Sequence, residues 1–190
     1  LDILCHGFPS AEIYTLIHNR AAVSDTINAH PIHTSWMQRL PDVHRRYRNF
    51  LPFFPSAVRG LRPAGVDLLI STSHCVAKAV RPPRGARHLC YCFTPMRYAW
   101  LFRDEYFGRN SLKRMVAGPM LAWLRRWDRL RSSDVDAFVA VSDCYAGYMR
   151  RHLGIPGAKM RVVPLGVNLD RFAPAPVRDD APFTFGYLGR

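Results

Sequence analysis

The sequence lacks any apolar run that approaches the roughly 18 residues needed for a membrane-spanning helix. This absence argues against an integral membrane protein, and we expect a cytoplasmic location with at most peripheral contact to the inner face of the membrane. The cysteines are few and odd in number, at five in 190 residues, so they do not form a complete disulfide framework. A chain of this length buries a core without such cross-links, and we expect reduced thiols.

Metal-binding spacing is also absent from the sequence. Cys90 and Cys92 fall on one face of a predicted strand, and His74 and His88 lie nearby in the sequence. A C-x-C pair without a second pair does not match the ligand spacing of structural zinc sites. We therefore expect no metal and no organic cofactor.

Acidic residues are scarce, with 14 Asp and Glu against 27 Lys and Arg and a net charge of +13. Such a surplus indicates an anionic partner, which leaves nucleic acid, phospholipid head groups and phosphate-bearing substrates open. Residues 81–131 hold twelve of the basic residues and only three acidic ones. The positive charge is therefore local.

Residues 111–131 predict a long basic amphipathic helix, because apolar side chains recur at helical spacing and basic side chains fill the other positions. One interpretation is a helix that packs its apolar stripe on a sheet and leaves its charges in water. The other is a surface that docks on anionic lipid, with Trp123 and Trp127 near the head groups and Arg125 and Arg126 on the phosphates. Both can hold at different points along one helix.

Short β-branched runs alternate with helical stretches along the chain. Several of the runs are continuously apolar, as strands buried on both faces are. This alternation predicts an α/β fold with a Rossmann-like parallel sheet and helices on both faces. The predicted strands are residues 12–17, 66–71, 87–92, 135–141 and 160–163, and the predicted helices are residues 41–51, 111–131 and 142–153.

Both ends of the sequence predict a piece of a larger protein. The chain opens on Leu1 and closes on a stretch that reads as a strand entering a turn. Residues 172–182 contain three prolines, as is typical of an extended linker between domains. We therefore expect one domain over residues 1–171, a linker over residues 172–182 and the first strand of a second domain over residues 183–190.

Polar and aromatic residues follow the predicted strands at the points where these end. The carboxyl ends of parallel strands gather at one edge of a sheet, where ligands bind. Hydroxyls, an imidazole and a guanidinium at such an edge suit sugar hydroxyls and phosphates. The candidate sugar- or acceptor-binding residues are Ser73, His74, Phe93, Thr94, Arg97, Tyr98, Ser142 and Gly166.

Seven short segments in the same order resemble family 4 glycosyltransferases, particularly bacterial mannosyltransferase-like members. Each segment is unspecific by itself, but together they extend over almost the whole sequence. They are IYTL at residues 13–16, HTSW at 33–36, VDLLISTSHCVAK at 66–78, CYCFTPMRYAW at 90–100, VD with VS at 135–136 and 141–142, PLGV at 164–167 and LGR at 188–190.

The resemblance implies the N-terminal lobe of a GT-B fold, in which two Rossmann-like lobes face each other, with its first strand and its C-terminal lobe missing. It further implies an enzyme that transfers a hexose, with mannose as the candidate sugar, from a nucleotide-diphosphate sugar to a glycan or lipid-linked acceptor with retention of configuration. The acceptor would bind mainly to the N-terminal lobe and the nucleotide to the C-terminal one. This chain by itself would then be inactive.

The resemblance also assigns roles to single residues. Arg190, preceded by Gly189, would match the arginine that binds the donor's diphosphate at the start of the second lobe. Phe93 departs from the family pattern, because many relatives carry a histidine at that position. A phenyl ring cannot donate a hydrogen bond, so either His74 supplies the missing polar group, as the candidate catalytic residue, or the protein works without one.

Two other classes of function remain open. A nucleic-acid-binding module would explain the charge, but the sequence contains no recognisable RNA-binding strand motif, zinc module or helix-turn-helix. A non-catalytic domain that binds carbohydrate or a membrane surface is the stronger alternative. The sequence also shows no nucleophile constellation, which is compatible with transfer that needs no protein nucleophile.

Overall fold

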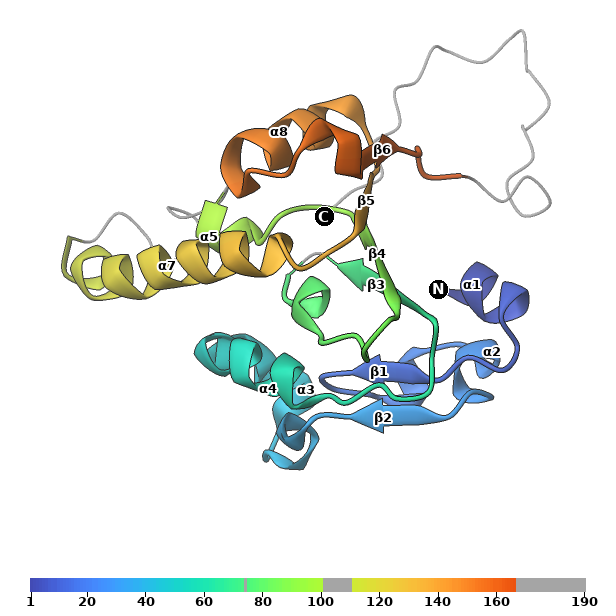
Figure 1. Ribbon diagram of the computed structural model, residues 1–190. Coiled ribbons are helices and arrows are strands. Elements are labelled where there is room, and N and C mark those ends of the chain that lie inside the picture. The colour runs from blue at the N-terminus through green and yellow to red at the C-terminus, as the bar shows by residue number, and fades with distance from the viewer. Residues whose placement is uncertain (74, 101–110, 167–190) are drawn as a thin grey trace, which may run out of the picture.

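The computed structural model describes residues 1–73, 75–100 and 111–166 (Figure 1). The linker predicted over residues 172–182 and the strand predicted over residues 183–190 lie outside these ranges. None of the helices in the described part is both long and apolar enough to cross a membrane.

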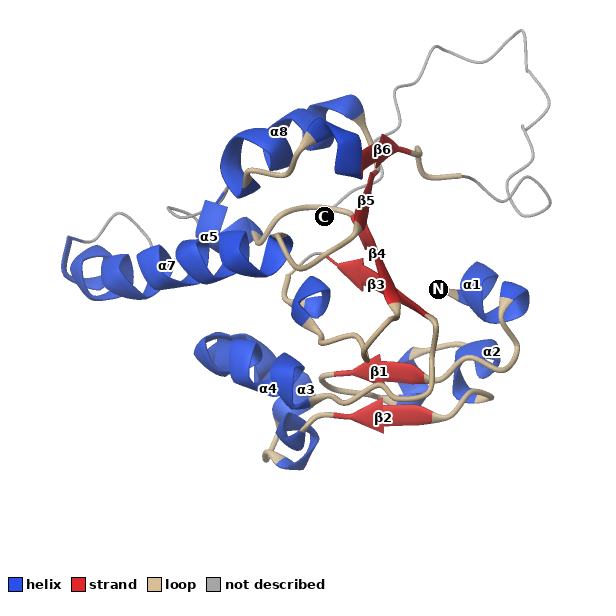
Figure 2. Ribbon diagram, viewed as in Figure 1, coloured by secondary structure: helices blue, strands red, loops and turns tan. Residues whose placement is uncertain are grey.

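The main sheet has four parallel strands in the order β3-β4-β5-β6 (Figure 2). The strands are β3 (Leu68–Ser73), β4 (Arg87–Cys92), β5 (Ala137–Ala140) and β6 (Met160–Val162). Each falls on a run that predicted a strand, although β3 begins and ends two residues later than expected. Parallel neighbours joined by helical crossovers are the Rossmann-like arrangement, and the predicted α/β fold class is confirmed.

A second, two-stranded parallel sheet holds β1 (Ile13–Thr15) and β2 (Ile32–Thr34). The first of these lies inside the predicted strand at residues 12–17. The second was not predicted, because three residues are too few to show a strand's alternation. Its register places Thr15 opposite Thr34, and the backbone N–H of Ser35 donates to the Thr15 carbonyl at 3.1 Å.

The two longest helices match their predictions. They are α7 (Ser111–Ser132) and α8 (Asp143–Leu153). Ser142 caps α8, because its hydroxyl accepts a hydrogen bond from the Tyr145 N–H at 3.3 Å. The same helix ends at Gly154, which adopts the left-handed conformation at φ 71° that favours glycine.

The helix predicted over residues 41–51 is wrong in extent and in type. Asp42 adopts a left-handed conformation at φ 52°, and α3 (Val43–Arg46) is a single turn after it. A 3₁₀ helix with Pro52 inside it then covers Tyr47–Phe53 before α4 (Phe54–Gly60) begins. Proline removes a backbone donor, so the segment cannot continue as one α-helix.

Shorter helices complete the described structure. They are α1 (Asp2–Gly7), α2 (Asp25–Asn28), α5 (Arg97–Trp100) and 3₁₀ turns at Arg20–Ala22, Trp36–Arg39, Ala77–Ala79 and Gly157–Lys159.

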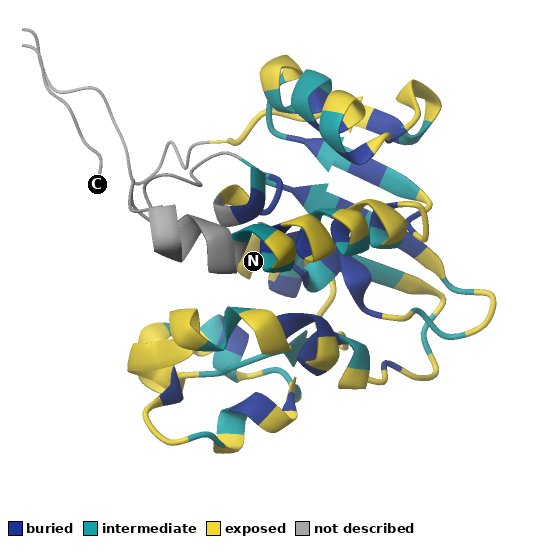
Figure 3. Cartoon of the chain, turned by 90° about the vertical axis from the view of Figure 1, so that its left-hand side faces the viewer, coloured by how far each residue is buried: buried dark blue, intermediate teal, exposed yellow. Residues whose placement is uncertain are grey.

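One face of the main sheet carries its most deeply buried side chains. Cys90, Cys92, Phe138 and Ala140 point to this face and pack with the apolar side of α8. Leu121 and Leu124 of α7, with α4 and the segment after β3, form an adjoining core cluster. Figure 3 shows the outer sides of these helices, where exposed and buried residues alternate along each helix. On β4, the residues that alternate with Cys90 and Cys92, such as Leu89 and Tyr91, point to the opposite face of the sheet and are half-buried.

Candidate functional site

The four parallel strands end level with one another. In the register of the sheet, Ser73 pairs with Cys92, Cys92 with Ala140, and Ala140 with Val162. The backbone continues this alignment, because the Phe93 N–H donates to the Ser73 carbonyl at 2.9 Å. Residues that follow the strands therefore meet at one edge, as the sequence predicted. In open parallel sheets this is the edge where ligands bind.

Two of the predicted hydroxyls at this edge support the local backbone. Ser73 is 1% exposed, and its hydroxyl accepts a hydrogen bond from the Cys75 N–H at 3.4 Å. The Ser142 hydroxyl caps α8 through the Tyr145 N–H. Both hydroxyls therefore stabilise the backbone at this edge, and neither is reserved for ligand binding.

Phe93 and Thr94 follow β4 and are half-buried. The Phe93 ring meets the ring of Tyr91 edge to face at a centroid distance of 5.1 Å. The Tyr91 hydroxyl donates to the Val163 carbonyl at 3.1 Å, which ties the end of β4 to the end of β6. The Thr94 hydroxyl oxygen is buried, and among the described residues it has no hydrogen-bond partner. It is therefore a polar atom at this edge whose hydrogen-bonding capacity is unused in the described part of the chain.

The remaining predicted residues divide between described and undescribed parts of the chain. Arg97 begins α5 and is exposed, so its guanidinium is accessible beside the edge, and Tyr98 follows it in the same helix. Gly166 is exposed beyond the end of β6. His74, Gly189 and Arg190 lie outside the described residues, and their roles stay predictions.

The four membrane-surface candidates on α7 fall into two pairs. Trp123 is 48% exposed, and Arg126 is exposed as well. Trp127 is half-buried and packs against the core cluster that contains Leu121 and Leu124. Arg125 is also half-buried, and its Nε donates to the Ala99 carbonyl at 2.6 Å. Only the first pair points outward.

A buried ion pair that the sequence analysis missed lies behind the edge. Lys78 Nζ is 2.6 Å from Asp128 Oδ1, and the side chains are 1% and 0% exposed. The other carboxylate oxygen, Oδ2, accepts a hydrogen bond from Trp100 Nε1 at 2.9 Å. Within the described part of the chain, neither Lys78 Nζ nor Asp128 Oδ1 has a further hydrogen-bond partner.

Lys78 keeps its charge in this buried position. Burial lowers the pKa of Lys78, but the charge and hydrogen bond of Asp128, together with the nearby Cys92 and Cys90, raise it by more in sum, so the net pKa lies above the ordinary value for lysine. The pair joins the segment after β3 to α7, and through Trp100 it also joins α5, the helix that begins with Arg97. Its contacts therefore help to hold α5, the helix that Arg97 begins, against α7.

One signal in the sequence could have indicated the acidic member of this pair, although not its partner. Asp128 is the only acidic residue in α7, and it lies four and seven positions after Leu124 and Leu121 on the helix's apolar stripe. A carboxylate on a buried stripe requires a cationic partner. The sequence does not name that partner, because Lys78 comes from a distant segment.

Two thiols lie close to the same ammonium group. Burial raises the pKa of Cys90, whereas a hydrogen bond from Cys90, followed by the charge of Lys78, lowers the pKa of Cys92. Among the described residues, no group of three or more His, Cys, Asp and Glu side chains could hold a metal ion.

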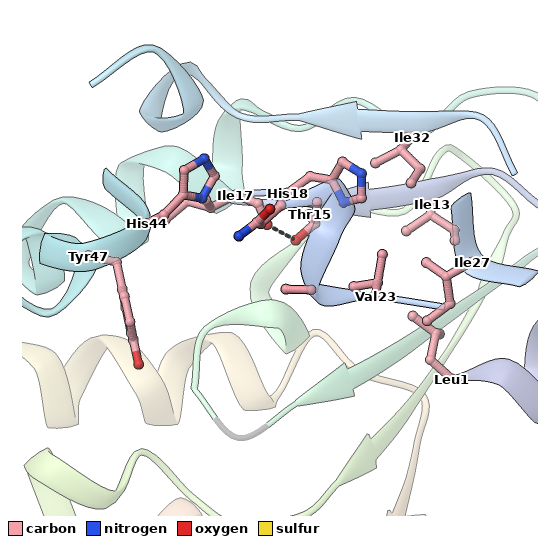
Figure 4. Close-up of a pocket in the computed structure, with 12 residues that line it drawn as sticks. Leu1, Ile13, Thr15, Ile17, His18, Val23, Ile27, Ile32, His44 and Tyr47 are labelled. Carbon is pink, nitrogen blue, oxygen red and sulfur yellow. Dashed lines mark hydrogen bonds between the residues drawn. The ribbon is translucent and has the colours of Figure 1, made fainter. Parts of the chain in front are cut away.

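A cavity of about 410 Å³ lies elsewhere, beside the two-stranded sheet (Figure 4). No residue of the main sheet lines it, and its walls are largely aliphatic. We therefore place the candidate site at the strand-end edge, where hydroxyl and guanidinium groups gather. The cavity is lined by Leu1, Ile13, Thr15, Ile17, His18, Asn19, Ala22, Val23, Ile27, Ile32, His44 and Tyr47.

The parallel α/β fold and the polar strand-end edge define a Rossmann-like lobe of the kind found in two-lobed GT-B glycosyltransferases. A family model described as Glycosyltransferase Family 4 matches residues 4–171. The match covers well over half of the chain, and the chain belongs to this family. No curated protein and no solved structure matches the chain.

Proposed function

We propose that the whole protein transfers a hexose, with mannose as the candidate sugar, from a nucleotide-diphosphate sugar to a glycan or lipid-linked acceptor, with retention of configuration. The chain described here supplies the acceptor side of that reaction. Membership of family 4 supports the transferase class. A lipid-linked acceptor would also bring the lobe to a membrane surface.

One observation carries this proposal. The four parallel strands end at the same level, and the side chains that follow them suit a glycosyl acceptor. The exposed guanidinium of Arg97 suits a phosphate or a polar sugar face. The buried Thr94 hydroxyl suits a sugar hydroxyl, and the Phe93 ring suits the apolar face of a pyranose. These three residues follow one strand and lie at one edge.

The chemistry assigned to the donor rests on residues beyond the described ranges. As the bond between sugar and diphosphate breaks, negative charge develops on the leaving nucleoside diphosphate. A fixed arginine lowers the barrier by stabilising that charge, and we assign this role to Arg190, with Gly189 beside it. His74 is the candidate polar group next to the transferred sugar. The proposal includes no metal and no organic cofactor.

A comparison of two arginines near opposite ends of β4 tests the acceptor assignment. Arg97 follows the carboxyl end of β4, and Arg87 begins its amino end, and both are exposed. In the full protein, Arg97→Gln is expected to raise KM for the acceptor by about 10- to 100-fold, the range for lost hydrogen bonds to a charged group. Arg87→Gln and the KM for the donor are expected to stay unchanged. Equal effects of the two substitutions would contradict the assignment.

A further inference from the structure

The outward side of α7 combines exposed apolar and cationic side chains. Trp123 is 48% exposed and Leu130 is 49% exposed, and Ala122, Arg126 and Arg129 are exposed as well. The spacings of three and four residues place these five on one side of a helix with 3.6 residues per turn. We call these five residues the outer stripe. It is the solvent side of the helix whose opposite side holds Leu121 and Leu124 in the core.

The outer stripe carries positive charge and no negative charge. The only acidic residue of α7 is Asp128, which is 0% exposed and paired with Lys78 on the inner side. No carboxylate of α7 is therefore available to neutralise Arg126 and Arg129 at the surface.

Two guanidinium groups of α7, that of Arg129 in the outer stripe and that of Arg125 beside it, are held in place. Arg125 and Arg129 lie over the Trp100 ring, at 5.4 and 5.0 Å from its centroid. Arg129 Nε donates to the His152 carbonyl of α8 at 2.7 Å. Burial, followed by the charges of Arg151, Arg129 and Arg125, lowers the pKa of His152, so three cations lie close together here. An anion at this surface would relieve their mutual repulsion.

We propose that the outer stripe docks on an anionic phospholipid bilayer. Trp123 and Leu130 enter the boundary between head groups and acyl chains, and Arg126 and Arg129 bind the lipid phosphates. Helices that lie in the plane of a membrane interface show this combination of aromatic or aliphatic and basic residues. A nucleic acid would satisfy the arginines but would leave Leu130 in water, so the bilayer fits the whole stripe better. This inference goes beyond the transfer reaction and does not depend on it.

Co-sedimentation of the chain with vesicles tests the inference. We expect binding to vesicles of phosphatidylcholine mixed with phosphatidylglycerol and no binding to phosphatidylcholine alone. Arg126→Gln is expected to weaken binding by about fivefold, which is the effect of one cation near an anionic surface. Trp123→Ala is expected to weaken binding by about tenfold, because the ring no longer leaves water.

Matched substitutions elsewhere serve as controls. Trp36 is 42% exposed, close to the exposure of Trp123, and Arg81 is exposed outside α7. Trp36→Ala and Arg81→Gln are expected to bind as tightly as the unaltered chain. Circular dichroism checks that each variant is folded, and Leu130→Ala provides a second apolar probe of the stripe.

Three outcomes would overturn the inference. They are equal binding to neutral and anionic vesicles, equal losses in the α7 variants and their controls, and binding to RNA that exceeds binding to vesicles and is insensitive to Leu130→Ala. The vesicle assay uses no sugar donor. Its failure is therefore distinguishable from a failure of the proposed transfer reaction.

Discussion

At the scale of single residues, the most consequential contact is the buried pair of Lys78 and Asp128. Each charge lost its hydration when the chain folded, and each is compensated mainly by the other, at 2.6 Å. Trp100 completes the cluster through its hydrogen bond to Asp128. Removal of one charge leaves the other uncompensated in the core, whereas removal of both does not.

Lys78→Met is therefore expected to lower the free energy of unfolding by about 3 to 5 kcal/mol, the usual cost of breaking a buried pair. The double variant Lys78→Met with Asp128→Asn is expected to be more stable than Lys78→Met alone, because the asparagine still accepts the Trp100 hydrogen bond and carries no charge. Chemical denaturation of both variants measures the difference. A double variant less stable than the single one would contradict the account of this pair.

His88 is a second buried residue that affects stability, through its protonation state. Burial lowers its pKa to about 4, and its Nε2 shares a hydrogen bond of 2.9 Å with the Ser71 hydroxyl. Because the folded-state pKa lies below the unfolded value of about 6.5, the unfolded chain takes up a proton first as the pH falls. The stabilisation from neutral His88 is complete above pH about 6.5 and is lost as the pH falls to about 4.

Unfolding experiments between pH 7 and pH 4 are expected to show this loss, which amounts to roughly 3 kcal/mol for a shift of that size. His88→Gln removes the titrating group and is expected to flatten the dependence of stability on pH. His44→Gln replaces an exposed histidine and is the control. An unchanged slope in His88→Gln would show that another group causes the acid sensitivity.

At the scale of elements, α8 shows how capping residues fix the start and end of the helix that follows β5 at the strand-end edge. Ser142 begins the helix as its cap, and Gly154 ends it in a left-handed conformation. The helix packs Ala146, Met149 and Leu153 on the sheet beside Phe138. Ser142 was predicted from the sequence to bind sugar, and the structure shows that its hydroxyl also fixes the start of the helix.

Ser142→Ala is expected to cost about 1 kcal/mol of unfolding free energy, because the Tyr145 N–H loses its acceptor. Ser142→Asp keeps an acceptor at the cap and is expected to retain most of the stability. Thermal unfolding measures both variants. If the aspartate variant is as unstable as the alanine variant, the hydroxyl has a role other than capping.

The elements that the sequence predicted well are those with strong local signals. The apolar runs of β3, β4 and β5 and the capped helix α8 appear close to their expected positions. β2 was missed because three residues carry no periodicity. The helix expected over residues 41–51 was wrong because the left-handed backbone at Asp42 and the nearby Pro52 do not allow one continuous α-helix.

The candidate site was predictable in part for the same reason. Strand ends follow from the strands, so the edge with Phe93, Thr94 and Arg97 could be expected from the sequence. The Lys78–Asp128 contact could not, because it joins segments that only the folded chain brings together. The sequence also did not distinguish outward Trp123 from inward Trp127, because both lie on the apolar side of a helical pattern.

At the scale of the whole molecule, three findings agree with the lobe of a glycosyltransferase. The main sheet is parallel, its strands end level, and the chain belongs to glycosyltransferase family 4. The strand-end edge and α7 are connected through Arg125, whose Nε donates a hydrogen bond to the Ala99 carbonyl of α5. If α7 docks on a membrane, the strand-end edge would therefore lie near lipid-linked acceptors. Membrane binding and sugar transfer can still be measured separately.

Sugar transfer by the full protein tests the central claim most directly. The assay supplies a panel of radiolabelled nucleotide-diphosphate hexoses together with glycan and lipid extracts as acceptors, in the presence of a chelator. The account predicts that label from one donor, with mannose as the candidate sugar, enters an acceptor and that Arg97→Gln reduces this entry while Arg87→Gln does not. A folded protein that neither transfers nor hydrolyses any donor in the panel would contradict it.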